Sequence, residues 1–260
     1  MNRQQTLTIT VFMLIFVILF FGFDTKNNKQ KALEKSRAQN LELISIERLK
    51  NEAVLNIPRG IAVKLGQLEE ETSLISVDTE LVDIYKEISN IWNNQGHPLI
   101  SAHYAERSAQ IINDEASWTK AGITFFLAAQ RQEEEKERKY SAKRGRAALE
   151  NAVSLNPLSP ESKINLAMSY VDVPSETEPM KGILMLLDIN REYPENTKVL
   201  LQLAKLALRT NQVSKAEQRL LNALEINPEL IEAHCLLYEI YREANRNKEA
   251  EERRILCEIQ

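Results

Sequence analysis

The chain has 260 residues, of which 27% are charged, and it contains only 7 Gly and 8 Pro. Its formal net charge of −4 argues against nucleic acid as the partner, because phosphate binding needs a basic surface. Ala, Leu, Glu, Lys, Arg and Gln fill most windows, and alternation of β-branched residues is scarce. These helix formers predict an all-α protein, and the length allows one or two domains with a sizeable core.

An uncharged run, LTITVFMLIFVILFFGF, follows a short tail of residues 1–6. The 17 residues from Leu7 to Phe23 would span roughly 26 Å as a helix, near the lower limit for crossing a bilayer. A cleaved signal peptide is the alternative, but only Arg3 precedes the run and no small-x-small cleavage site follows it. A buried core helix is less favoured, because the run has no polar face. We therefore expect a single transmembrane helix over residues 7–23.

The orientation of this anchor is predicted from the flanking basic residues. Only Arg3 and the amino terminus precede the run, whereas five basic residues follow it: Lys26, Lys29, Lys31, Lys35 and Arg37. The positive-inside rule therefore favours a cytoplasmic location for the large C-terminal part. We expect a single-pass protein of a bacterial-type inner membrane. The periplasmic orientation is the alternative.

Residues 24–77 are expected to form a charged helical stalk and N-terminal helices, interrupted near Pro58 and Gly60. An ordinary helix of a first hairpin is the alternative to the stalk. Two further helices are expected within residues 78–114, separated by the loop NNQGHP.

Three prolines, Pro157, Pro194 and Pro228, recur at intervals of 37 and 34 residues. Apolar residues between the last two prolines follow helical spacing in two consecutive runs. The first run is Leu200, Leu203, Ala204 and Ala207, and the second is Val213, Ala216, Leu220, Ala223 and Leu224. A proline then ends the second helix and begins the next turn. The interval therefore predicts repeated helix–turn–helix units.

This pattern resembles the tetratricopeptide repeat (TPR) family. The matching residues in an earlier unit are Trp118, Ala121, Gly122, Phe125, Gly145, Leu149 and Ala152, and in the last unit Leu237, Tyr241, Ala250 and Cys257. The resemblance implies four units at 115–159, 160–196, 197–230 and 231–260, with 78–114 as a degenerate pair. The fold class that we expect is an all-α, TPR-like α-solenoid preceded by the transmembrane helix. Charged Arg254, at a position that is normally apolar, suggests a terminal capping helix and an array that ends at Gln260.

The resemblance also implies a concave groove, formed by the first helix of each unit, that binds an extended peptide or a partner helix. Groove positions in the first two units include Ala116, Thr119 and Glu161. The main candidates are Ile123, Phe126, Ile164, Asn165, Met168, Lys198, Leu201, Lys205 and Leu208. Only Asn165 and Lys198 fit the carboxylate clamp of the family, so an apolar segment that also carries acidic groups is the expected ligand. The alternative is that the N-terminal helices fill the groove.

Catalytic, cofactor-binding and metal-binding residues are not expected, because the three histidines stand outside any known motif. Cys235 and Cys257 are expected to be small buried apolar residues. The basic stretch KERKYSAKRGR, residues 136–146, could bind anionic lipids or an acidic partner, or could be a solvated helix extension.

The sequence thus predicts a membrane-anchored scaffold that binds a protein partner and is not an enzyme. One alternative is a periplasm-facing helper of envelope biogenesis, like the anchored repeat proteins of the secretion translocon or of cytochrome c maturation. A self-assembling module, with homo-oligomers formed through residues 24–55, and a nucleic-acid binder are further alternatives.

Overall fold

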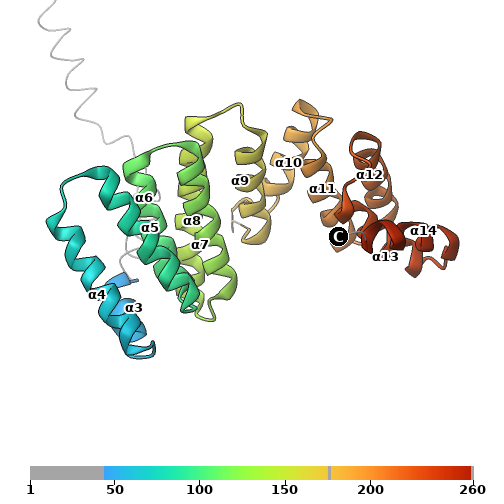
Figure 1. Ribbon diagram of the computed structural model, residues 1–260. Helices are drawn as coiled ribbons and strands as arrows, with labels where there is room; N and C mark the ends of the chain where they lie inside the picture. Colours follow the sequence, from blue (N-terminus) through green and yellow to red (C-terminus); the bar gives the residue numbers. More distant parts are fainter. Residues whose placement is uncertain (1–43, 175–176, 259–260) are drawn as a thin grey trace, which may run out of the picture. The chain divides into compact units, whose positions relative to one another are not determined.

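The computed structural model describes residues 44–174 and 177–258, and the regular elements within them are α-helices (Figure 1). The chain divides into two units, and the second unit, Ile46–Gln260, contains all of the helices described below. Two helices come first, α3 (Ile46–Val54) and α4 (Arg59–Leu74). The other helices are α5 (Asp78–Asn94), α6 (Pro98–Ile112), α7 (Glu115–Arg131), α8 (Glu135–Leu155), α9 (Pro160–Asp172), α10 (Lys181–Glu192), α11 (Thr197–Arg209), α12 (Val213–Ile226), α13 (Ile231–Glu243) and α14 (Asn247–Glu258).

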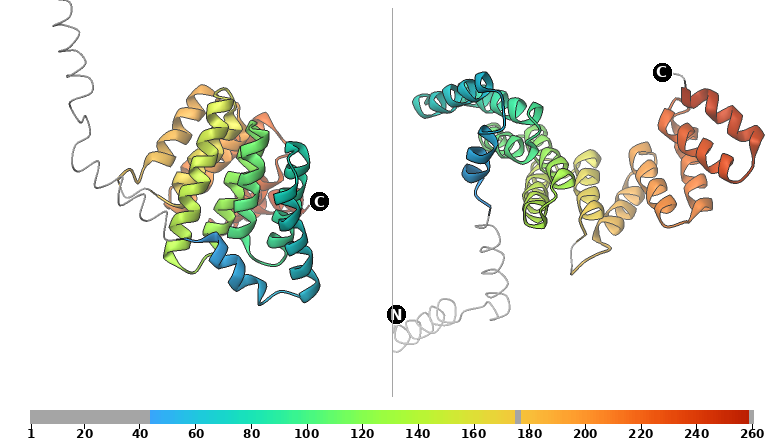
Figure 2. Two further views of the ribbon diagram at one scale, coloured as in Figure 1. Left: turned by 90° about the vertical axis from the view of Figure 1, so that its left-hand side faces the viewer. Right: turned by 90° about the horizontal axis from the view of Figure 1, so that it is seen from below.

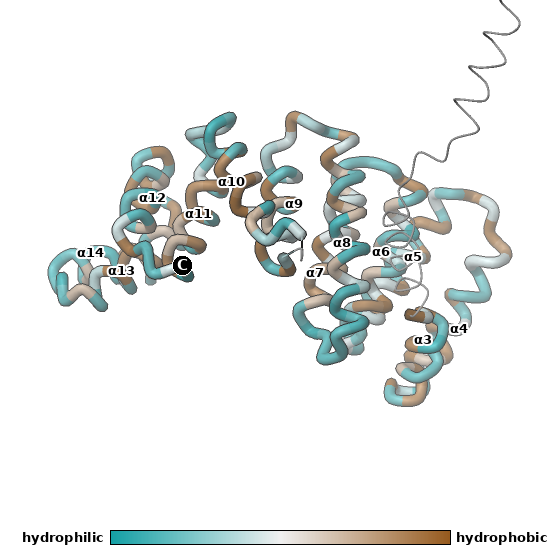
Figure 3. Tube along the Cα trace, turned by 180° about the vertical axis from the view of Figure 1, so that it is seen from behind, coloured by the Kyte–Doolittle hydropathy of each residue, from teal (hydrophilic) through white to brown (hydrophobic). Residues whose placement is uncertain are grey.

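From α5 onward the helices pack as consecutive hairpins, α5 with α6 through α13 with α14. The second helix of each hairpin contacts the first helix of the next one, so the hairpins lie side by side in chain order (Figure 2). Apolar and polar residues are interspersed along many of the helices (Figure 3), as expected when one face is buried and the other is solvated. The unit is thus built mainly from contacts between sequence neighbours.

The predicted location in a membrane is contradicted. Of the helices in residues 44–174 and 177–258, none is both long and apolar enough to cross a bilayer. The predicted transmembrane segment, residues 7–23, lies outside the described residues, as do residues 24–43 of the predicted stalk.

The described N-terminal helices pack against the hairpins. Ala53 of α3 and Leu65 and Leu68 of α4 share a buried cluster with Ile88 and Trp92 of α5. The described part of the predicted stalk region is therefore joined to the hairpin stack by an apolar core.

The three Xaa-Pro joints fold alike. Asn156, Tyr193 and Asn227 each end a helix and precede a proline. In each joint a backbone N–H three residues later donates to the carbonyl oxygen of this residue, at 3.1–3.2 Å. Proline has no N–H to donate and disfavours a helical conformation in the residue before it. This explains why each proline marks the step from one hairpin to the next.

The turns inside the last two hairpins also repeat. Asn211 and Asn245, 34 residues apart, both have a φ of 57°. The following residue donates its N–H to a carbonyl of the preceding helix, from Gln212 to Ala207 at 2.8 Å and from Arg246 to Tyr241 at 2.9 Å. Asparagine tolerates this left-handed conformation better than most residues do. The 34-residue sequence period is therefore also a period of backbone conformation.

The prediction that the two cysteines are small buried apolar residues is wrong. Cys235 of α13 and Cys257 of α14 form a disulfide, with their Cα atoms 4.9 Å apart, and both are half-buried. They are 22 residues apart and meet because the hairpin brings the two helices side by side.

Candidate functional site

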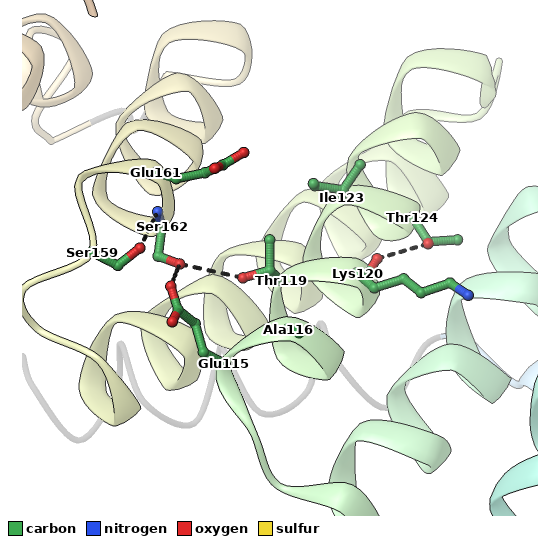
Figure 4. Close-up of a pocket in the computed structure, with 9 residues that line it drawn as sticks. All are labelled: Glu115, Ala116, Thr119, Lys120, Ile123, Thr124, Ser159, Glu161 and Ser162. Carbon is green, nitrogen blue, oxygen red and sulfur yellow. Dashed lines mark hydrogen bonds between the residues drawn. The ribbon is translucent and has the colours of Figure 1, made fainter. Parts of the chain in front are cut away.

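A hollow of about 610 Å³ lies between the first helices of two successive hairpins, α7 and α9 (Figure 4). We call it the α7–α9 hollow. It is lined by Glu115, Ala116, Thr119, Lys120, Ile123, Thr124, Ser159, Glu161 and Ser162.

Helix capping fixes the end of the hollow where both helices begin. Asp114 caps α7 by accepting a hydrogen bond from the N–H of Ser117 at 2.7 Å, in a capping box. Ser159 caps α9 in the same way, accepting from the N–H of Ser162 at 3.3 Å, and Pro160 occupies the first turn of the helix. These caps satisfy backbone donors that a helix start leaves free. They therefore define where the walls of the hollow begin.

Glu115 ties the two walls together. Its carboxylate accepts hydrogen bonds of 2.6 Å from the hydroxyl of Ser162 and from the amide of Asn156. Hydrogen bonds from Ser159, Ser162 and Asn156 lower the pKa of Glu115, because they stabilise the charged form. This carboxylate is thus committed to joining adjacent hairpins and is not available to a ligand.

Two groups on α7 remain open to a ligand. The side chain of Ile123 is 41% exposed and points into the hollow, whereas Lys120 lies on the other side of α7 (Figure 4). Among the described residues, no acidic group pairs with Lys120. On α9, Glu161 is already paired with Lys198 at 2.8 Å. The available groups are therefore an apolar side chain and a cation.

A second hollow, of about 240 Å³, adjoins the first across α7. It is lined by residues of α5, α6 and α7, and it shares Ala116 and Lys120 with the α7–α9 hollow. Its lining also includes Lys86, which pairs weakly with Asp83 at 3.5 Å. Together we call the two hollows the α7 groove. The exposed face of α7 lies between them, and two lysines line it.

The nine sequence-predicted groove residues lie in different environments. Of these, Ile123 lines the α7 groove, whereas Phe126, Ile164 and Leu201 are buried in the cores between helices. Asn165, Met168 and Leu208 are half-buried. Lys198 and Lys205 pair with Glu161 and Glu232. The assignment of these nine residues to a binding site stays a prediction.

The position pattern of the repeat family also pointed to Ala116, Thr119 and Glu161, which line the α7–α9 hollow. It missed five other lining residues: Glu115, Lys120, Thr124, Ser159 and Ser162. Ser159 and Ser162 carry a recognisable signal, because Ser159-Pro160 is a typical helix start.

The basic stretch at residues 136–146 does not form one free patch. Lys139 pairs with Glu135 at 2.8 Å, and Arg144 pairs with Glu106 of α6. The guanidinium of Arg146 stacks over the ring of Tyr170 at 4.6 Å. These cations are thus distributed over separate partners, as in a helix extension that packs on its neighbours.

Comparison by sequence finds neither a family model nor a curated protein that matches the chain. Solved structures with a similar arrangement include MamA of Desulfovibrio magneticus RS-1, which is 16% identical over 66% of this chain and 90% of that chain, with a TM-score of 0.44. PilF of Pseudomonas aeruginosa is 12% identical over 69% and 76%, with a TM-score of 0.48. YrrB, described as a TPR protein with an unusual peptide-binding site, is 12% identical over 74% and 90%, with a TM-score of 0.38.

Identities this low concern the fold alone. The hairpins described above make the described part of the chain an all-helical repeat solenoid. The transmembrane anchor that the sequence predicted in front of the solenoid has no support in the described residues.

Proposed function

We propose that the solenoid is a scaffold without catalytic activity that binds a protein partner as an extended peptide or a helix along the α7 groove. One observation carries the proposal: α7 presents both an exposed apolar side chain, Ile123, and a lysine without an acidic partner, Lys120, where the two hollows adjoin. A ligand that lies across α7 would bury apolar surface and place an acidic group against Lys120.

The form of the groove fits a peptide better than a compact small molecule. The α7–α9 hollow is large, but its lining comes mainly from the outer faces of two parallel helix starts, so a ligand would remain solvated on one side. Cofactor sites usually enclose most of their ligand.

A charge-reversal variant tests the proposal. The full chain carries a photo-reactive amino acid in place of Ile123, and partners cross-linked in cells are identified by mass spectrometry. Synthetic peptides from the captured partner are then titrated against the purified protein. Lys120→Glu should weaken the peptide at least tenfold, because it replaces attraction to the acidic group with repulsion.

Lys248→Glu is the matched control, since Lys248 is an exposed lysine on α14, outside the groove lining. We expect this variant to bind as the parent chain does. Equal affinity of the Lys120→Glu and Lys248→Glu variants would place binding away from the α7 groove.

A further inference from the structure

A separate cavity of about 250 Å³ lies where α3 meets the α5–α6 turn, the start of α6 and the α7–α8 loop. We call it the Glu137 cavity, after the carboxylate in its wall. It shares no lining residue with the α7 groove. Its volume lies below the roughly 300 Å³ at which pockets for drug-sized ligands begin, so it fits a single side chain or a small amine.

Glu137 is only 9% exposed, yet within the described part of the chain its carboxylate has neither a hydrogen-bond donor nor an ion-pair partner. Glu106 shows the usual arrangement in the same protein. It is 5% exposed and is paired with Arg144. Buried charges in proteins are normally paired in this way, because removal from water is otherwise costly. Glu137 is thus a largely buried acidic residue without a bonded partner, and it lines the cavity.

The position of Glu137 in the first turn of α8 explains only in part why a buried negative charge is tolerated there. A helix start favours negative charge, but here no backbone N–H donates to the carboxylate. Burial, with the nearby negative charge of Glu134, raises the pKa of Glu137. The electrostatic surroundings therefore leave the charged form in need of a cation.

Nearby cations do not meet that need. Arg48 of α3 lies close enough to attract Glu137, but it pairs with Glu52 at 3.4 Å. Arg131 lines the cavity without forming an ion pair to Glu137. Burial lowers the pKa of His97, another lining residue, and so disfavours its charged form. Arg48 thus attracts Glu137 from a distance, and no cation among the described residues bonds directly to the Glu137 carboxylate.

The rest of the lining suits a ligand with an aliphatic stem. Ala53, Leu99 and Ile100 line the cavity and are each less than 5% exposed. Basic side chains characteristically bury their methylene stems on apolar surface and present the charged head to polar groups. A head group on Glu137 would leave the stem against these three side chains.

We propose that the Glu137 cavity binds a basic head group, an ammonium or guanidinium on an aliphatic stem. The head group would donate hydrogen bonds to the Glu137 carboxylate, with Glu52 at the rim adding attraction. Two sources share this chemistry: a lysine or arginine side chain of a protein, and a free small amine.

The test titrates the full chain with N-acetyl-arginine amide, which models a protein side chain, and with agmatine, which is a free amine. N-acetyl-citrulline amide serves as the uncharged isostere. We expect the cationic probes to bind at least tenfold more tightly than the citrulline probe. Tighter binding of the capped arginine assigns the cavity to a protein side chain, and tighter binding of agmatine assigns it to a small amine. If no cationic probe binds better than the citrulline probe, the proposal is wrong.

Variants place the binding in the cavity. Glu137→Gln keeps the size of the side chain and should weaken the cationic probes at least tenfold. Glu52→Gln, an exposed change with little risk to folding, should weaken them a few-fold. Glu133→Gln, an exposed carboxylate outside the lining, is the control and should have no effect. Unchanged binding of the cationic probes in both cavity variants would overturn the assignment. Lys120→Glu should leave the binding of these probes unchanged, so the test of the Glu137 cavity is independent of the test of the α7 groove.

Discussion

Gly182 lies where α9 and α10 cross, and only a hydrogen fits on its Cα atom. A Cβ there would come within 2.5 Å of the carbonyl oxygen of Ala167 and 2.6 Å of the backbone nitrogen of Val171. Both contacts involve backbone atoms, which cannot move aside as a flexible side chain can. Gly122 and Gly145 play the same role between α7 and α8, since each would place a Cβ 3.1 Å from the carbonyl oxygen of the other. At these two crossings the helices can approach closely because glycine has no Cβ atom.

Gly182→Ala should therefore destabilise the protein by about 1–3 kcal/mol, the usual range for overpacking a filled site. The measurement is urea unfolding followed by circular dichroism. Gly66→Ala is the matched control, because Gly66 lies inside α4 with no atom within 4 Å of its added Cβ. The control should gain roughly 0.5–1 kcal/mol from alanine's higher helix propensity. A loss of stability in both variants would show that the crossing at Gly182 is not the cause.

At the scale of the element, α14 has little core of its own. Ala250 is its only buried residue among those described, and much of the helix is hydrophilic (Figure 3). Its other attachments are polar. Arg246, in the turn before α14, pairs with Glu217 of α12 at 2.7 Å, and Arg253 hydrogen bonds to the His234 ring at 3.1 Å. Besides the backbone, the disulfide to α13 is thus a covalent link between α14 and the rest of the solenoid.

Reduction of the disulfide should loosen α14 selectively. Closing a loop of 22 residues stabilises a fold by about 3 kcal/mol in the chain-entropy view. Hydrogen exchange of the α14 amides should therefore speed up on addition of a reductant, while exchange in α7 and α8 stays the same. The double variant Cys235→Ser/Cys257→Ser serves as the control, with fast exchange in α14 that no longer responds to the reductant. Slow exchange in the reduced parent chain would show that polar contacts alone hold the helix.

At the scale of the whole molecule, the sequence predicts the hairpins better than it predicts the site. The proline joints and the 34-residue interval arise from residues close together in the sequence, so they can be recognised in a single sequence. The burial of Phe126, Ile164 and Leu201 depends on the neighbouring hairpin that covers them, and a position pattern within one repeat does not contain that information. The packing of α3 and the pairing of the cysteines depend likewise on contacts between helices.

A solenoid held by contacts between neighbours should also come apart locally. Leu237 is fully buried in the cluster of α11 to α14, and Trp92 is fully buried in the cluster of α3 to α6. Leu237→Ala should cost about 2–5 kcal/mol and Trp92→Ala about 3–5 kcal/mol, because each leaves a cavity. In a single cooperative domain either loss would speed hydrogen exchange throughout. In the solenoid, we expect Leu237→Ala to speed exchange in α11 to α14 and spare α5 and α6, with the reverse for Trp92→Ala. Each variant is the control for the other, and uniform loss of protection in both would show that the hairpins unfold as one unit.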